Sequence, residues 1–475
     1  MAKENEHGME IVAESRLGRA WAVLREALRG TEQSFTTGPL GRGVFLLAVP
    51  MVVEMAGESL FALVDAFFVA RLGAEALASV GLTEACLEIV YAIAVGLATG
   101  TTALVARRIG AGDAAGARVA AVQSLAIGLG IAALFGTAGW FATPSLLRFM
   151  GGDPATVATA TPYMRWMLGG EVTILLLFLV SGIFRGAGDA AIAMRALWIA
   201  NGLNVLIDPC LIFGYGPFPE LGLAGAAIGT NIGRGFGVAY ALWRLFKGHG
   251  RLELGWRDLR FDPGVARHLL RVSAGGIAQY LIAGAAWIGL ARVLASFGSV
   301  VLAGYVVAIR IVIFVILPAW GFSNAAATLV GQNLGAQRPD RAERAALLTG
   351  FWNMVFMLGV MVLFLFAAEP IVKRFSADAS VHATAIDALR IISYGYGFYA
   401  WGMVMSQAFN GAGDTTTPMF INLVCFWLFQ IPMALWMSSL MGPSGVFWAI
   451  ALAYSLSALV GVVIFRRGRW KLRKV

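Results

Sequence analysis

Long apolar runs recur along most of the chain and are separated by short polar connectors. A helix needs about 20 apolar residues to cross the hydrocarbon core of a bilayer. Twelve runs reach this length, at 44–70, 76–106, 118–142, 158–184, 190–215, 222–246, 268–296, 301–328, 343–368, 384–410, 416–440 and 443–465. The pattern predicts an all-α polytopic membrane protein with twelve transmembrane helices.

Composition supports a membrane protein and argues against a soluble protein that binds nucleic acid. Only 13% of the residues are charged, against about 25% in soluble domains, and the net charge of +9 is spread over the connectors. Cys86, Cys210 and Cys425 stand singly within apolar runs, without CxxC or Cys/His spacing. We therefore expect no disulfide, no zinc site and no cofactor other than a coupling ion.

The distribution of Lys and Arg predicts an orientation in the membrane. If the N-terminus and every second connector share one side, that side collects about 27 of these residues, and the opposite side about six. Basic connectors face the cytoplasm, so both termini are expected to be cytoplasmic. The Ala-, Gly- and Arg-rich, Lys-poor composition suggests the plasma (inner) membrane of a prokaryote.

The longest polar connector divides the chain into two halves. Residues 248–267 separate a first lobe at 44–247 from a second lobe at 268–465, and a basic tail follows at 466–475. The polar segment 1–43 lacks the apolar core of a signal peptide. Apolar and basic residues alternate there at helical spacing, which favours either an amphipathic helix on the membrane surface or a partly ordered tail.

The two lobes repeat each other. ARRIGAGDAAGARVA at 106–120 aligns with GQNLGAQRPDRAERAA at 331–346, and FRGAGDA at 184–190 aligns with FNGAGDT at 409–415, both at an offset of about 225 residues. Six crossings separate matching positions, so they have the same transmembrane orientation. A parallel repeat of this kind places a substrate site between two halves.

Acidic residues interrupt the first apolar run. Glu54, Glu58 and Asp65 stand at i, i+4 and i+11, which places them on one stripe of a helix. An ionisable group at the bilayer centre costs at least about 2.5–3.5 kcal/mol, so such residues usually face a bundle interior or an aqueous cavity. The roles of Glu54, and of the acids in the second and fourth runs, stay open.

The fifth run carries a second polar face. Asn201, Asn204 and Asp208 stand at i, i+3 and i+7, and Pro209 is expected to kink the helix beside the acid. Carboxylate and amide oxygens suit either a proton or a hard cation such as Na⁺. The alternative is that Asp208 only caps a broken helix.

These motifs together resemble the multidrug and toxic compound extrusion (MATE) family. The resemblance is carried by Pro50 and VDAFFVARLGAEALASVG in the first two runs, by ARRIGAGD, FRGAGD, the NxxxDPxLIFG run and GQNLGA, and it covers about residues 36–465. SFTTGPLGRGVFLLAVP is similar to the entry of the first helix in the DinF-like branch. The resemblance implies a V-shaped pair of six-helix lobes that exchanges protons or sodium ions for organic cations.

The resemblance also implies where the coupling ion binds. In DinF-like members the ion site maps onto Asp65, Asn204 and Asp208, where Na⁺ is one candidate, with Thr230 as a less direct addition. Glu58 shares the stripe of Asp65 and is a further candidate. The NorM-like branch also uses acids in segments seven and ten, where this chain has Gln279 and Tyr399. This departure favours a site in the first lobe.

The expected cargo is a lipophilic organic cation. Tyr394, Tyr399 and Trp401 stand close together in segment ten, and cation–π contacts of about 0.5–2 kcal/mol each would suit a flat cation. Asn201 and Gln279 are the polar candidates for the same cavity. We expect a monomeric secondary antiporter in contact with membrane lipid, without nucleic-acid partners and without enzymatic activity. A flippase or exporter of a lipid-linked saccharide or other amphiphile is the alternative.

Overall fold

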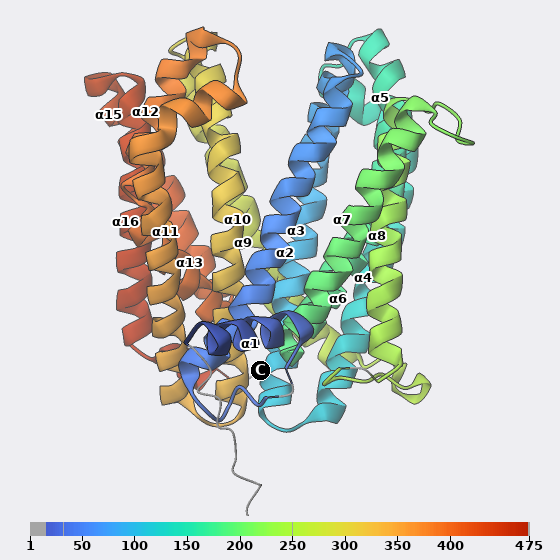
Figure 1. The fold of residues 1–475 in the computed structure, drawn as a ribbon, viewed down its shortest axis with the longest axis vertical. Coiled ribbons are helices and arrows are strands. Elements are labelled where there is room, and N and C mark those ends of the chain that lie inside the picture. The colour runs from blue at the N-terminus through green and yellow to red at the C-terminus, as the bar shows by residue number, and fades with distance from the viewer. Residues whose placement is uncertain (1–15, 32, 249, 474–475) are drawn as a thin grey trace, which may run out of the picture.

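The computed structural model describes residues 16–31, 33–248 and 250–473. The first fifteen residues of the predicted N-terminal tail lie outside these ranges. The rest of that tail contains helix α1 (Arg16–Arg29). Ala27 on this helix is buried, whereas Trp21 is 61% exposed. Figure 1 shows α1 lying crosswise to the long helices, as expected of an amphipathic helix at a membrane surface.

The remaining helices form long rods in chain order. Those of the first half are α2 (Leu40–Ala70), α3 (Ala74–Gly110), α4 (Ala114–Phe149), α5 (Pro154–Gly169), α6 (Glu171–Ala187), α7 (Ala190–Phe213) and α8 (Leu223–Phe246). Those of the second half are α9 (Pro263–Ala295), α10 (Ser299–Gly335), α11 (Pro339–Phe375), α12 (His382–Ser393), α13 (Tyr396–Gly411), α14 (Thr416–Asn422), α15 (Gln430–Met441) and α16 (Pro443–Arg466). A π-helical turn at Leu423–Phe429 joins α14 to α15.

Ten spans of the described chain are long and apolar enough to cross a membrane. The pair α5–α6 forms one of them, although the helix is interrupted at Gly170. The two other predicted crossings correspond to α8 and to the α12–α13 pair. Helix α8 is less apolar because it contains Asn231 and Arg234, and α12 and α13 are separated by a break at Tyr394 and Gly395.

The long helices form two groups arranged as a V. Helices α2–α8 make one group and α9–α16 the other, and Figure 1 shows the groups approaching each other at the end where α1 lies and diverging toward the opposite end. We call the α1 end the narrow end. The groups touch through α2 and α3 on one side and α9 and α10 on the other. The C-terminal end of the described chain also lies at the narrow end.

Glycines of the repeated sequence motifs bring the two groups together. A Cβ at Gly110 would lie 2.0 Å from the carbonyl oxygen of Gln332, and a Cβ at Gly335 would lie 2.1 Å from that of Arg107. Each contact is the counterpart of the other, because 225 residues separate Gly110 from Gly335 and Arg107 from Gln332. Only glycine allows backbones to approach so closely. The ARRIGAG and GQNLGA motifs therefore form a pseudo-symmetric seam at the narrow end.

A segment of turns and irregular backbone between α1 and α2 lies at the narrow end and is held from both groups. We call residues 29–31 and 33–38 the strap. Its carbonyl oxygens accept hydrogen bonds from Arg195 of the first half and Arg251 of the connector that follows it, and from Asn333, Arg338 and Arg341 of the second half. Phe35 is buried in a cluster with Ala190 of α7 and Leu329 of α10. The strap thus ties the two groups together.

Candidate polar site in the first helix group

Close packing of α7 against α8 positions the polar residues of α7. Gly225, Gly229, Gly233 and Gly237 recur every fourth residue on α8. A Cβ at Gly233 would lie 2.5 Å from the carbonyl oxygen of Ala200, and one at Gly229 would lie 2.1 Å from Asp208 Oδ1. This glycine stripe brings the α7 backbone and the Asp208 carboxyl group directly onto α8.

The centre of the site is a small hydrogen-bonded network. Asn204 Nδ2 donates to Asp208 Oδ1 over 2.9 Å and to Thr230 Oγ1 over 3.0 Å. Asp208 is fully buried, Asn204 is 2% exposed and Thr230 is 7% exposed. The spacing of four residues between Asn204 and Asp208 places them on one helical face, and α8 adds Thr230. The structure thus brings together three of the residues singled out in the sequence.

Helix α2 contributes a second carboxyl group. The Asp65 side chain lies close to that of Asp208, and the two carboxyl groups interact electrostatically. Two neighbouring carboxylates repel each other when both are ionised, so a proton or a cation between them stabilises the pair. Glu58 lies two turns earlier on α2 and accepts a hydrogen bond of 3.3 Å from Asn201 Nδ2. Asn201 therefore forms part of the contact between α7 and α2.

Three oxygen atoms in this network have unused acceptor capacity. Asp65 Oδ1, Asn204 Oδ1 and Asp208 Oδ2 are buried and have no hydrogen-bond partner among the described residues. Buried polar atoms are normally paired, so three unpaired oxygens on residues of one network suggest a bound species. Oxygen atoms from two carboxylates and an amide fit a proton or a hard cation such as Na⁺.

The sequence reasoning gave Arg234 no place in this network. Arg234 lies one helical turn after Thr230 on α8, and its electrostatic partners include Glu58 and Asp65. Arg234 Nη2 donates to the hydroxyl of Tyr91 on α3 over 2.9 Å. The spacing of four residues from Thr230 was a visible signal for this placement. The site therefore contains a fixed positive charge beside its acidic groups.

The other acids of the first group have separate surroundings. Glu54 is buried and forms an ion pair of 3.4 Å with Arg185, which accounts for its presence in α2. Glu84 and Glu88 on α3 are exposed. Glu171 begins α6, and both of its carboxylate oxygens are buried without a hydrogen-bond partner among the described residues.

The aromatic candidates of segment ten have separate partners in the structure. Tyr394 stacks on Trp448, Tyr399 stacks on Tyr454, and the indole of Trp401 donates to Met354 Sδ. Helix α12 ends at Ser393 and α13 begins at Tyr396, so these residues do not belong to one continuous helix. Gln279 is also apart from them: its Nε2 donates to Asn410 Oδ1 and to the carbonyl oxygen of Thr415.

Comparison with known proteins identifies the family. The model of the MatE family matches residues 50–210 and 288–436, which is more than half of the chain. The chain belongs to this family of multi-span membrane transporters, which are not enzymes. The all-helical fold predicted from the sequence is confirmed by a solved structure, an outward-facing MATE multidrug resistance transporter, with a TM-score of 0.87 and 28% identity. The match covers 93% of this chain and 98% of that structure.

Curated relatives match about nine-tenths of the chain. A probable multidrug resistance protein NorM from Thermotoga maritima is 24% identical, over 90% of this chain and 93% of its own length. An FAD transporter from Shewanella oneidensis is 26% identical, over 90% of this chain and 94% of its own length. The names of these two relatives indicate different transported compounds, so similarity alone does not identify the cargo of this chain.

Proposed function

We propose that the protein is a secondary antiporter that exports a lipophilic organic cation in exchange for protons or sodium ions. The observation that carries this proposal is the contact between Asp65 and Asp208, with Asn204 and Thr230 around it and three buried oxygen atoms without partners. A coupling ion that enters this network lowers the cost of burying two carboxylates. Cargo and ion then compete, because one acidic site does not hold two positive charges at low cost.

The same proposal includes an orientation of the protein in the membrane and a branch of the MATE family. The excess of Lys and Arg at the narrow end supports a cytoplasmic location for both termini, in a prokaryotic plasma membrane. The helices diverge on the opposite, external side (Figure 1), and the likeness to an outward-facing transporter supports an outward-open state. The acidic network in the first group supports the DinF-like branch. The proposed functional unit is a monomer.

Alternating access would require α2, α7 and α8 to repack when the ion binds. These helices already meet at the network, since Asp65 comes from α2, Asn204 and Asp208 from α7, and Thr230 from α8. Neutralising the carboxyl pair removes the charge that cargo requires and changes the packing that holds α2 against α7. Each net charge moved across the membrane contributes about 2.3 kcal/mol per 100 mV.

Transport by reconstituted protein tests the proposal. Efflux of a cationic dye from proteoliposomes is measured under a proton gradient alone and under a sodium gradient alone. We expect Asp65→Asn and Asp208→Asn to abolish gradient-driven efflux, whereas Glu75→Gln, an exposed acid at the start of α3, leaves it unchanged. Wild-type efflux by either aspartate variant would refute the coupling site. The gradient that drives the wild-type protein identifies the coupling ion.

A second candidate cargo is an amphiphile that carries phosphate. Two observations favour it: a relative is an FAD transporter, and Arg234 places a positive charge in the site. Arg292 and Arg310 on α9 and α10 are exposed and could assist. Thermal protection by a panel of cationic dyes, flavin nucleotides and lipid-linked phosphates separates the candidates. Stabilisation by the anionic compounds alone would replace the cation proposal with this one.

A further inference from the structure

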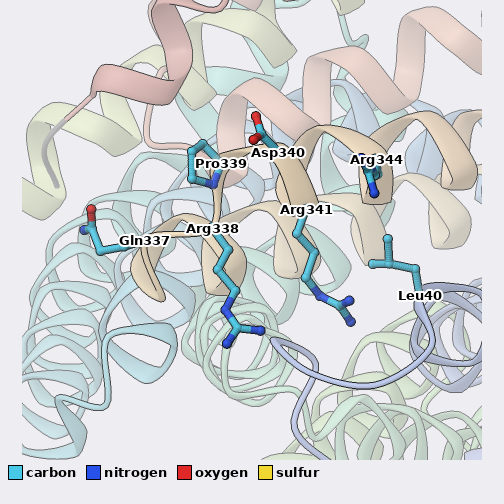
Figure 2. Close-up of a pocket in the computed structure, with 7 residues that line it drawn as sticks. All are labelled: Leu40, Gln337, Arg338, Pro339, Asp340, Arg341 and Arg344. Atoms are coloured by element: carbon cyan, nitrogen blue, oxygen red, sulfur yellow. The ribbon is translucent and has the colours of Figure 1, made fainter.

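A basic pocket opens at the narrow end, where the strap meets α11. The pocket has a volume of about 400 Å³ and is lined by Leu40, Gln337, Arg338, Pro339, Asp340, Arg341 and Arg344. Figure 2 shows Arg338 and Arg341 extending to the same side of the α10–α11 turn, with Leu40 at the pocket edge. The first residue of α2 therefore borders a site dominated by three arginines.

The arginines have donors to spare. Arg338 Nη1 donates to the carbonyl oxygen of Thr36 over 2.7 Å, and Arg341 Nη2 donates to those of Thr37 and Gly38. Arg341 Nε is buried and has no hydrogen-bond partner among the described residues. Arg344 is exposed and makes no hydrogen bond or salt bridge within the described chain.

The acidic group of the pocket does not balance this charge. Asp340 is the carboxylate on the lining, and it pairs with Lys471, which lies 3.5 Å away and also holds Glu343 at 2.6 Å. The hydrogen bond with Glu343 raises the pKa of Lys471, so this lysine stays charged. Lys471 is shared between two carboxylates, so three arginines and one lysine face two acids and the pocket keeps an excess of positive charge.

The position of the pocket suits a lipid headgroup. Helix α1, whose exposed Trp21 and Arg25 are typical of an interfacial helix, is fixed to the start of α2 by the Glu26–Arg42 ion pair of 2.6 Å. The pocket is bounded by Leu40, so it lies beside this interfacial helix. Basic pockets at the cytoplasmic ends of transmembrane helices bind anionic lipid headgroups.

We propose that the pocket formed by Arg338, Arg341 and Arg344 binds the phosphate of an anionic phospholipid, and that this lipid loosens the strap. A phosphate oxygen accepts charge-assisted hydrogen bonds about twice as strong as those of a neutral carbonyl. It therefore competes with the carbonyls of Thr36, Thr37 and Gly38 for Arg338 and Arg341. The proposal rests on the orientation given under Proposed function, in which the narrow end faces the cytoplasm.

Lipid binding is measured on the full-length protein by native mass spectrometry with phosphatidylglycerol, and with phosphatidylcholine as the neutral lipid. We expect a preference for phosphatidylglycerol that Arg344→Gln weakens about fivefold, because one Arg near an anionic surface contributes about that factor. Arg344 makes no strap contact, so this variant leaves the fold intact. Arg374→Gln, at the opposite end of α11, is the matched control and is expected to bind as the wild type does.

Two results would overturn the lipid site. Equal binding by the wild type and Arg344→Gln excludes these arginines, and displacement of phosphatidylglycerol by an equal concentration of inorganic phosphate indicates a free-anion site instead. Asp208→Asn separates this proposal from the transport proposal, since it is expected to lose coupling and to keep lipid binding. The lipid-binding measurement can therefore be interpreted even if the proposed coupling site is wrong.

The effect on the strap has its own readout. A spin label at the exposed Gln33 is expected to become more mobile in nanodiscs of phosphatidylglycerol than in nanodiscs of phosphatidylcholine. In Arg344→Gln, the spectra of this label in the two lipids are expected to differ less from each other than they do in the wild type. Identical spectra for the wild type in both lipids would refute the loosening of the strap.

Discussion

Asn204 donates its side-chain amide to Asp208 across one turn of α7, over 2.9 Å. The same nitrogen also donates to Thr230, which leaves Asn204 Oδ1 buried and without a partner among the described residues. Asn204 therefore orients Asp208 with its nitrogen and presents its oxygen to whatever binds. This double use makes the residue sensitive to any substitution that removes either atom.

Asn204→Leu is expected to weaken ion coupling while the protein still folds. A hydrogen bond to a charged group contributes about 1.5–3 kcal/mol, so the apparent affinity for the coupling ion should fall by about 10- to 100-fold. The measurement is the ion-concentration dependence of dye efflux in proteoliposomes. Asn201→Leu, one turn earlier with a longer bond of 3.3 Å to Glu58, is expected to change the affinity less than about threefold. Similar losses in both variants would contradict the special position of Asn204.

The close approach of α8 to Asp208 predicts the effect of a single methyl group. A Cβ at Gly229 would lie 2.1 Å from Asp208 Oδ1, so Gly229→Ala must displace the carboxyl group. We expect a loss of at least about 90% of efflux, together with an overpacking cost of about 1–3 kcal/mol, seen as a lower melting temperature.

Gly235 on the same helix provides the matched control for Gly229. A Cβ at Gly235 meets no atom within 4 Å, and alanine is favoured over glycine within helices by about 0.5–1 kcal/mol. Gly235→Ala is therefore expected to transport normally and to melt at the same or a higher temperature. Normal transport by Gly229→Ala would mean that the Asp208 carboxyl group is free to move.

The helices and the acidic network followed from different kinds of sequence information. Apolar length predicted the spans because lipid leaves no other partner for backbone polar groups. The contact of Asp65 with Asp208 was expected from the family resemblance, whereas the helical spacing of Asn204 and Asp208 showed only that both lie on one face of α7. That spacing could not place Arg234, because its partners Tyr91 and Asp65 come from helices that approach only in three dimensions.

The sequence did not show the helix break in segment ten. Tyr394 and Trp401 are two turns apart and would share one face of a continuous helix, whereas Tyr399 would lie on another face. In the structure, α12 ends at Ser393 and α13 begins at Tyr396. Nothing in the local sequence required that break, because Gly395 has an ordinary right-handed conformation, with φ of −79°. It also lies against α16, where a Cβ would meet Ala451 at 2.9 Å. Tertiary packing therefore decided the register.

The glycine seam at the narrow end predicts a variant that favours separation of the two groups. A Cβ at Gly110 would lie 2.0 Å from the carbonyl oxygen of Gln332, and backbone cannot yield as a side chain can. In Gly110→Ala we expect a longer distance between spin labels at Ala115 and Asp340. Gly359→Ala on α11 meets no atom within 4 Å and should leave the distance unchanged. An unchanged distance in Gly110→Ala would show that the seam is not specific for this state.

Asp189 beside the strap predicts a pH dependence of stability. Burial raises its pKa, against the lowering effects of the Arg251 backbone N–H and of the Arg251, Arg244 and Arg195 guanidinium groups. An acid with a raised folded pKa contributes stability below its unfolded pKa of about 3.9, and this is lost as the pH rises through the folded value. The melting temperature of Asp189→Asn, relative to the wild type, should therefore be more favourable at pH 7 than at pH 4.

Asp113 supplies a control of opposite sign, because its pKa is lowered by hydrogen bonds from the Gly116 backbone N–H and from Arg108. Its stabilising effect is present above the unfolded pKa and is lost as the pH falls through the folded value. Asp113→Asn should therefore be least favourable, relative to the wild type, at pH 7, and should approach the wild type in acid. Melting curves of all three proteins in one detergent, from about pH 2.5 to pH 7, give both comparisons, because the Asp113 effect is lost only below its unfolded pKa of about 3.9. Parallel curves for the wild type and Asp189→Asn would show that burial does not control the ionisation of Asp189.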